Sequence, residues 1–420
     1  MDRPYLYSAC RELGVVTFDI TDADAPFPTD TILPASLSFL RPTNLVQYEN
    51  YLFVSLGGFD GFFPQNPGLA IIDIANPELP VIKDVWFDAM YNQGCAIVIT
   101  DGTYAYLGAM DEGVIIVDVS NVNDIQFVSN ILPDIEFPDV PGLFSTPNAR
   151  GLYKLNEETL LVANDHGGLR WIDISNIEEP VETGKYMNDE LYAIAAPAYN
   201  NIAVKDHYAY VSVDYCGLDV IDVGDSEMET VLWINPWDCD TSNWIGRAGH
   251  TNEVVIKDDL LFLSGGDSEV LVYDISTPAI PVLVGQFAFP FDSVVAWSVD
   301  VNDSYVSLAL VNNSVFGIPY YSNTGGIKIL DYNVVTTIDE NDVTIKILPN
   351  PVSDKLFIQF TASSQAFIAV VDMLGNIVFE KVLSGESSLS IDFESFAIGI
   401  YQLQCFNTEG YTTQYAIVKL

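Results

Sequence analysis

Short apolar runs alternate with turn residues along the whole chain, and over the first 338 residues one pattern of them repeats. The pattern is a glycine, which is Glu269 in the sixth copy, followed by an aliphatic residue, a variable residue, two mostly aliphatic residues and an aspartate. Its seven copies end at Asp19, Asp73, Asp118, Asp173, Asp222, Asp274 and Asp331. These aspartates are 45 to 57 residues apart, and internal periods of roughly 20 to 50 residues are typical of repeat proteins.

Each repeat contains further apolar runs, so we predict that one unit is a four-stranded meander with strands A to D. The repeated phrase is strand C. Runs of four to eight residues that are rich in Val, Ile, Tyr and Phe and bounded by Gly, Asn, Asp or Pro are typical of strands. Such a run precedes each phrase as strand B and begins at Tyr5, Tyr51, Tyr104, Thr159, Tyr208, Leu260 and Tyr305.

Four antiparallel strands that are apolar on both faces cannot bury those faces alone, whereas a ring of such sheets can. The sequence therefore predicts an all-β fold, with a seven-bladed β-propeller over residues 1–338. The phrases LAIID, VIIVD and LDVID resemble the LVIVD-repeat family, and the resemblance covers most of this segment. Strand A of the first blade is missing. We expect either that the native N-terminus lies upstream of Met1 or that residues 332–338 fold back to supply the strand.

The recurring aspartate has a structural and a catalytic interpretation. It ends strand C and is followed by turns rich in Ser, Thr, Asn and Pro, where an Asp side chain accepts hydrogen bonds from backbone amides. Catalysis rarely needs the same residue in every blade. We therefore predict seven equivalent turns rather than seven sites.

A second domain is predicted after a polar linker at residues 339–342. Residues 343–420 carry a formal charge of about −3 against −42 for the whole chain, and seven short apolar runs in this length are typical of a small β-sandwich. Alternation along the sixth run places Tyr401, Leu403 and Cys405 on one side. Cys405 is thus expected to be a core thiol.

Residues 343–420 resemble the type A C-terminal sorting domain of type IX secretion. The resemblance lies in Leu348-Pro349-Asn350-Pro351, in the phrase VDMLGNIV around Gly375, in Gly399-Ile400-Tyr401, and in the terminal AIVKL with Lys419. It implies export through the type IX machinery of a Gram-negative bacterium, to the medium or to the outer-membrane surface. No basic and then apolar leader follows Met1, which again favours a native start further upstream.

Composition excludes several classes of function. With 58 acidic and 16 basic residues, the net charge of −42 would repel nucleic acid, and no apolar run is long enough for a membrane helix. Five cysteines are too few and too scattered for a disulfide scaffold. Cys216 and Cys239 either bridge neighbouring loops or are buried as small apolar residues. We expect a monomer with an acidic, solvated surface.

Loop lengths predict which face of the propeller binds a ligand. Strand direction alternates within a blade, so B-to-C and D-to-A connections emerge on one face. The long insertions, residues 57–67, 133–148, 233–249 and 311–325, all fall on that face, and loops held by a rigid scaffold often carry function.

Aromatic and polar residues of these loops are the predicted ligand-binding set. Exposed aromatic rings stack on sugars or fill protein pockets, although these rings could instead pack on one another and close the channel. A lone arginine among many acids could hold a ligand carboxylate or pair with neighbouring aspartates. The predicted residues are Phe62, Phe63, Arg150, Trp237, Trp244, His250, Asn252, Tyr320 and Tyr321.

One cation site is predicted, and several catalytic motifs are missing. Asp238, Asp240 and Asn243 place oxygen ligands at near-alternating positions, which suits calcium, but the glycine and final glutamate of an EF-type loop are absent. The three histidines have no zinc-site spacing, and the chain has no nucleophile elbow, P-loop or dinucleotide fingerprint.

The sequence therefore favours an extracellular binding module for a polysaccharide or protein ligand, with no catalytic residue assigned. The alternative is an extracellular hydrolase or lyase that acts at the channel mouth, with or without a cation. Two converging carboxylates, or a histidine with a carboxylate, would favour this enzyme. A passive adhesion or assembly module is the third interpretation.

Overall fold

The computed structural model describes most of the chain, which divides into two units, Met1–Tyr332 and Asn333–Leu420. We treat each unit by itself. The described residues are 4–58, 65–138, 148–194, 198–214, 216–235, 251–265, 270–287, 295–311, 326–331, 345–348, 352–360, 365–372, 377–384, 388–407 and 412–419.

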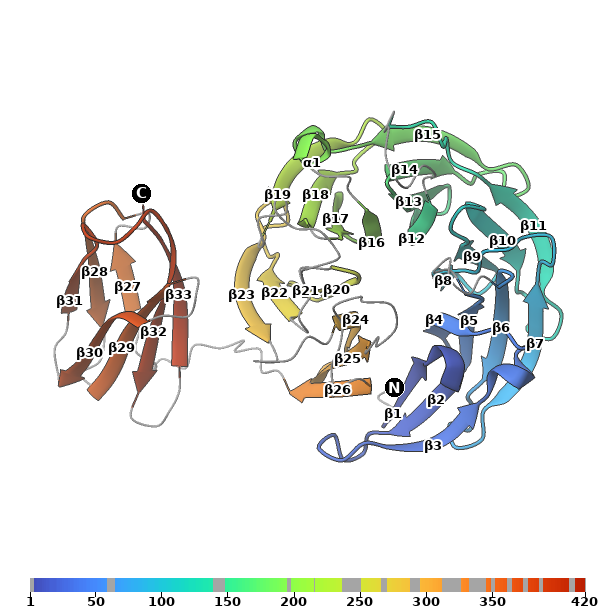
Figure 1. Ribbon diagram of the computed structural model, residues 1–420, viewed down its shortest axis with the longest axis horizontal. Helices are drawn as coiled ribbons and strands as arrows, with labels where there is room; N and C mark the ends of the chain where they lie inside the picture. Colours follow the sequence, from blue (N-terminus) through green and yellow to red (C-terminus); the bar gives the residue numbers. More distant parts are fainter. Residues whose placement is uncertain are drawn as a thin grey trace. The chain divides into compact units, whose positions relative to one another are not determined.

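The first unit consists of antiparallel sheets whose strands follow one another in sequence order. Figure 1 shows the sheets arranged around a central axis, so the unit is a β-propeller. Two sheets have three strands among the described residues: β1 (Tyr5–Ala9), β2 (Val15–Asp19) and β3 (Phe27–Ile32), and β24 (Val295–Val301), β25 (Tyr305–Val311) and β26 (Gly326–Asp331).

Five sheets have four strands. In each of them the first strand lies nearest the axis and the last strand lies at the rim (Figure 1). Their strands are β4 (Pro42–Tyr48), β5 (Tyr51–Leu56), β6 (Gly68–Asp73) and β7 (Val81–Phe87); β8 (Ile97–Thr100), β9 (Tyr104–Gly108), β10 (Val114–Asp118) and β11 (Gln126–Ile131); β12 (Asn148–Asn156), β13 (Thr159–Asp165), β14 (Gly168–Asp173) and β15 (Val181–Tyr186); β16 (Tyr199–Lys205), β17 (Tyr208–Val213), β18 (Gly217–Asp222) and β19 (Glu229–Ile234); and β20 (Val254–Lys257), β21 (Leu260–Ser264), β22 (Val270–Asp274) and β23 (Val282–Phe287).

Neighbouring sheets bury their faces against each other, as the all-apolar strand pattern requires. Side chains alternate between the two faces of a strand. In β13, Leu160 and Val162 join an apolar cluster with the preceding sheet, whereas Leu161 and Ala163 join a cluster with the following one. Similar clusters fill the other described seams between consecutive sheets.

The repeated aspartates make the predicted turns. In six repeats the Oδ1 atom of the aspartate accepts a hydrogen bond from the backbone N–H two residues later, at 2.7 to 2.9 Å. Hydrogen bonds from the hydroxyl and from the backbone N–H of the residue two positions later hold the pKa of Asp19, Asp173 and Asp274 below the usual value. Residues 332–344, which directly follow Asp331, lie outside the described part of the chain.

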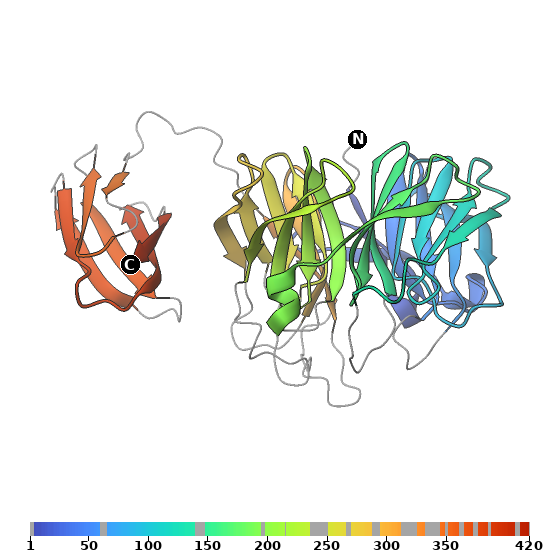
Figure 2. The ribbon, with the colours of Figure 1, turned by 90° about the horizontal axis from the view of Figure 1, so that it is seen from above.

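One short α-helix interrupts the otherwise all-β fold. Helix α1 (Asp189–Ile194) lies between β15 and β16, beyond the strand ends (Figure 2). The Oδ1 atom of Asn188 accepts hydrogen bonds from the N–H groups of Glu190 and Leu191, both at 3.1 Å. An asparagine in this place caps a helix N-terminus, and six residues are too few for a recognisable helical period. No helix in the described part of the chain is long and apolar enough to cross a membrane.

The second unit contains the seven predicted strands in two sheets. Val352, Phe393, Leu403 and Ile417 belong to its buried core, together with Tyr401. The side chain of Cys405 lies outside the described residues. The strands are β27 (Ile345–Leu348), β28 (Lys355–Phe360) and β31 (Ser388–Asp392) in one sheet, and β29 (Gln365–Asp372), β30 (Ile377–Ser384), β32 (Gly399–Asn407) and β33 (Thr412–Lys419) in the other.

Candidate functional site

Four of the inner strands share an irregularity at the end where the long connections leave. In β4, β12, β16 and β24 the pairing with the next strand skips one residue, respectively Thr43, Arg150, Asn200 and Trp297. Such a bulge releases one residue from the ladder and re-aims its side chain. We call this end of the inner strands, around the propeller axis, the mouth.

A small residue on the second strand accommodates each bulge. Ser55 and Ser212 are fully buried, and their hydroxyl oxygens lie 3.1 and 3.0 Å from the N–H groups of the facing inner-strand residues Asn44 and Asn201. Ala163 and Ala309 occupy the same register position in the sheets that carry Arg150 and Trp297. The sequence contained this signal, because the strand-B runs repeatedly place a serine or alanine there.

Two of the bulged residues fasten neighbouring sheets. The hydroxyl of Thr43 donates to the carbonyl of Cys95 at 2.6 Å, and the side-chain amide of Asn200 donates to the carbonyl of Thr251 at 2.6 Å. Because each bond joins two adjacent sheets, it stabilises the packing of those sheets at the mouth.

Arg150 instead reaches sheets that are not its neighbours. Its Nη2 atom lies 3.5 Å from Oδ1 of Asn252, which precedes β20, and its guanidinium carbon lies 5.7 Å from the ring centre of Trp297 in β24. In Figure 1, β12 and β24 lie on opposite sides of the axis. A side chain of β12 that contacts both must extend across the mouth.

Few interactions satisfy the Arg150 guanidinium. The side chain is only 14% exposed, yet the nearest described carboxylate oxygen, Oδ2 of Asp165, is 3.8 Å away. A charge-assisted hydrogen bond between such groups is about 2.7 to 2.9 Å long. The ion pair with Asp165 is therefore loose, and the guanidinium retains donors for another oxygen.

Buried amide atoms without partners occur on three residues at the mouth ends of the strands. Among the described residues, Nδ2 of Asn252, Oδ1 of Asn200 and Oδ1 of Asn164 are buried and make no hydrogen bond. Nearly all buried polar groups in proteins are paired with protein or water. Unpaired polar atoms at the mouth are suited to a polar ligand.

A histidine and a carboxylate also meet at the mouth. Nε2 of His166 lies 3.4 Å from Oδ1 of Asp165, and both side chains are mostly buried. This is the pairing that would favour an enzyme. No group of three or more His, Cys, Asp or Glu residues that could hold a metal ion occurs within the described ranges.

Arg170 anchors the connection that enters β12. It occupies the variable position of the strand-C phrase and is fully buried. Its Nη1 atom pairs with Oε1 of Glu182 at 2.7 Å, and its Nη2 atom donates to the carbonyls of Asp134 and Phe137 at 3.1 and 2.7 Å. The guanidinium also lies 4.8 Å from the Phe137 ring centre.

Asp219 anchors α1 from the same variable position in the next repeat. Its carboxylate accepts hydrogen bonds from the hydroxyls of Tyr199 and Tyr186 at 2.8 and 3.1 Å, and from the amide of Asn188 at 3.0 Å. Burial raises the pKa of Asp219 to about 6, although these three donors oppose the shift. Sequence analysis missed both anchors.

Of the predicted ligand-binding residues, the structure brings Arg150 and Asn252 together. The loops that carry the rest, including the predicted calcium ligands, lie outside the described residues. Of the predicted sorting residues, Gly399, Tyr401 and Lys419 lie in β32 and β33. Residues outside the described part are Phe62, Phe63, Trp237, Trp244, His250, Tyr320, Tyr321, Asp238, Asp240, Asn243, Pro349, Asn350, Pro351 and Gly375, and also Cys239.

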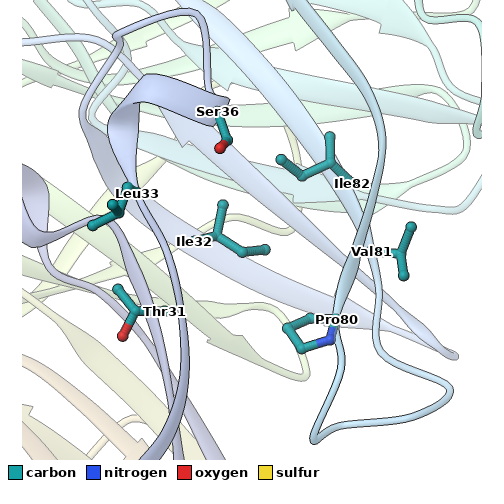
Figure 3. A pocket seen from close by; sticks show the side chains of 7 residues that line it. All are labelled: Thr31, Ile32, Leu33, Ser36, Pro80, Val81 and Ile82. Atoms are coloured by element: carbon teal, nitrogen blue, oxygen red, sulfur yellow. The ribbon is translucent and has the colours of Figure 1, made fainter.

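A hollow at the rim is a weaker candidate. It has a volume of about 390 Å³ and lies between β3 and β7, beside the turn that contains Ser36 (Figure 3). Its lining is mostly aliphatic, and Leu33 and Val81 are each 56% exposed. A binding site usually combines an apolar wall with converging polar groups. The mouth has such groups, and the hollow offers only Thr31 and Ser36 among its lining side chains.

Comparison with known families confirms both resemblances. Five segments match the LVIVD repeat, residues 43–85, 95–132, 156–188, 199–228 and 248–288. Residues 346–419 match the secretion system C-terminal sorting domain, which indicates export by type IX secretion to the cell surface or extracellular space. No curated protein matches the chain.

Solved structures show similarity in fold alone. A chain of the mitotic checkpoint complex has a TM-score of 0.53 at 9% identity, over 78% of this chain and 84% of that one. The WD40 repeats of RRP9 give 0.51 at 10% identity, over 78% and 91%. YCF48 bound to D1 peptide gives 0.50 at 8% identity, over 80% and 91%.

Proposed function

We propose that this chain, an LVIVD-repeat propeller joined to a secretion sorting domain, is an extracellular binding protein. The propeller has seven blades in this proposal, and the mouth with its long loops receives a polysaccharide or protein ligand. The sorting domain at residues 343–420 takes the chain through the type IX machinery. Binding then occurs at the cell surface or in the medium.

The observation that carries the proposal is that Arg150 of β12 contacts both Asn252, just before β20, and Trp297 of β24 at the mouth. Contacts between non-neighbouring sheets are not needed to pack a blade on the next one. A mostly buried guanidinium with loose partners is unfavourable unless something else completes its hydrogen bonds. In this proposal, the ligand accepts the remaining hydrogen bonds of the guanidinium.

A hydrolase or lyase is the second candidate, because His166 and Asp165 lie within reach of each other at the mouth. A carboxylate can hold a histidine in one orientation for acid–base catalysis. Binding remains the stronger candidate, since a general acid–base pair also needs a nucleophile or a second acid in place. Once a ligand is found, its cleavage by the wild type and by His166→Ala distinguishes the two candidates. An enzyme would cleave the ligand and lose this activity in the variant, whereas a binding protein would cleave it in neither form.

The test uses the labelled full chain on arrays of glycans and of peptides, followed by variants of the loop aromatics. Changing Phe62, Phe63, Tyr320 and Tyr321 together to Ala should weaken binding of any hit at least about tenfold, or about 1.4 kcal/mol. Thermal unfolding should change little.

The matched control removes exposed rings from the rim. Phe27, Phe87 and Phe127 are 41 to 55% exposed and lie on the outer strands β3, β7 and β11. Their replacement by Ala should leave binding unchanged. Equal binding by the wild type and the loop variant would contradict the proposed surface.

A further inference from the structure

We propose that the mouth captures the free C-terminal carboxylate of a basic peptide segment, with Arg150 as the residue that receives it. This inference rests on the proposed binding function and names the chemistry of its ligand. It requires an anion receptor inside a protein of strongly negative charge. The described contacts of Arg150 provide that receptor.

The donors at the mouth suit one carboxylate. The Arg150 guanidinium offers a planar fork that matches two carboxylate oxygens. Its present contacts, an amide oxygen at 3.5 Å and a carboxylate oxygen at 3.8 Å, are longer than those of a filled fork. Nδ2 of Asn252 is a further buried donor without a partner among the described residues.

The charge balance favours a single negative charge. Asp165 already lies 3.8 Å from the guanidinium, and its other oxygen faces His166. A phosphate would add nearly two negative charges beside that carboxylate. A carboxylate adds one, and it displaces no close ion pair because the Asp165 contact is loose.

A peptide C-terminus has an N–H donor beside its carboxylate, and a simple carboxylic acid has none. The side-chain oxygen of Asn200 is an acceptor that such a donor could satisfy. Asn200 holds the same bulged position in β16 that Arg150 holds in β12. Its Oδ1 atom is a buried acceptor without a described partner. The backbone N–H of a C-terminal residue lies only two bonds from the carboxylate carbon and supplies a donor beside it.

The negative charge of the whole chain favours a basic peptide over an acidic polysaccharide as the ligand. A net charge of −42 repels a polyanion and attracts cations over about one Debye length, roughly 8 Å at physiological salt. A chain of uronates would have to overcome that repulsion at every sugar. The acidic protein attracts the lysines or arginines of a basic segment. Only the terminal carboxylate of that segment is repelled by the overall charge, and Arg150 binds it.

The experiment compares two forms of one probe on the purified full chain. The probe is a fluorescein-labelled mixture of lysine-rich decapeptides of otherwise random sequence, made once with a free C-terminal carboxylate and once with a C-terminal amide. Fluorescence anisotropy measures binding at low salt and at about 0.15 M salt. We expect the free acid to bind at least about tenfold more tightly than the amide at both.

Variants then assign the preference to Arg150. Arg150→Met should lower binding of the acid to that of the amide, and Arg150→Lys should give an intermediate value because it keeps the charge and loses the fork. The control is Lys83→Met, which removes one positive charge from the rim strand β7. It should preserve the difference between acid and amide. Tryptophan fluorescence checks that each variant is folded.

Equal binding of acid and amide to the wild type overturns the inference, as does a preference that survives in Arg150→Met. Failure of both probes to bind counts against it as well. Tighter, Arg150-dependent binding of a galacturonate oligosaccharide would assign the mouth to acidic sugars instead. An array ligand that binds equally well to Arg150→Met leaves the proposed function standing while this inference fails.

Discussion

The two ends of the propeller strands differ in how much they repeat. At the end opposite the mouth, aspartates of six repeats make the same turn, with hydrogen bonds that agree within 0.2 Å. At the mouth, equivalent bulges carry Thr43, Arg150, Asn200 and Trp297, which differ in size, charge and partners.

The difference shows what each end has to satisfy. The turn between strands C and D has the same backbone geometry in each of these sheets. In each, an aspartate side chain accepts a hydrogen bond from the N–H two residues later. Side chains at the mouth meet partners from other sheets, so each position has its own surroundings. We therefore expect substitutions at the turns to have small and equal effects, and substitutions near the mouth to have large and unequal ones.

The largest effect is expected for Arg170→Met. The change leaves Glu182 and the carbonyls of Asp134 and Phe137 without their buried donor, and breaking a buried ion pair on one side destabilises by about 3 to 5 kcal/mol. Urea unfolding followed by tryptophan fluorescence measures it, because all six tryptophans precede residue 333 and report on the first unit.

The matched control for Arg170 is Lys185→Met. Lys185 pairs with Asp134 of the same connection, but both side chains are more than one-third exposed. A surface ion pair contributes about 0 to 1 kcal/mol. If Lys185→Met were as destabilising as Arg170→Met, burial would not be what distinguishes this anchor.

The next effect depends on pH and concerns Asp219. Its pKa is about 6 in the folded chain against about 3.9 in an unfolded one. Between those values the folded state keeps a proton that the unfolded state has released, so this group makes the fold less stable as pH rises. The loss approaches about 3 kcal/mol from pH 4 to above pH 6.

The change Asp219→Asn removes this titration. The free energy of unfolding of the wild type minus that of the variant, measured from about pH 4 to about pH 7, should therefore fall as pH rises. A constant difference over that range would show that Asp219 titrates at its ordinary pKa. The anchor of α1 would then be no different electrostatically from an exposed aspartate.

The sequence predicts the repeated end well and the mouth poorly, for a physical reason. The turn aspartates act within two residues along the chain, so their pattern is visible in the repeat. Arg150 meets Asn252 across 102 positions, and only the packing of the sheets places them together. Arg170 and Asp219 were visible as charges inside strands that are apolar on both faces. A buried charge needs a partner, and that signal should have marked both as anchors.

The smallest effect tests whether the repeated turns are equivalent. In Asp118→Ala, the N–H of Ser120 loses its 2.9 Å bond and the hydroxyl of Ser120 loses its 2.6 Å bond. Because the turn is open to water, we expect a loss of about 1 kcal/mol, and Asp118→Asn, which keeps an acceptor, should lose less. The same change at Asp73, whose Oδ1 atom accepts one bond of 2.9 Å from Ala75, should have the same or a slightly smaller effect in urea unfolding. A loss at either position as large as that of Arg170→Met would contradict the contrast between the two ends, because a locally satisfied turn cannot depend on the rest of the ring to that degree.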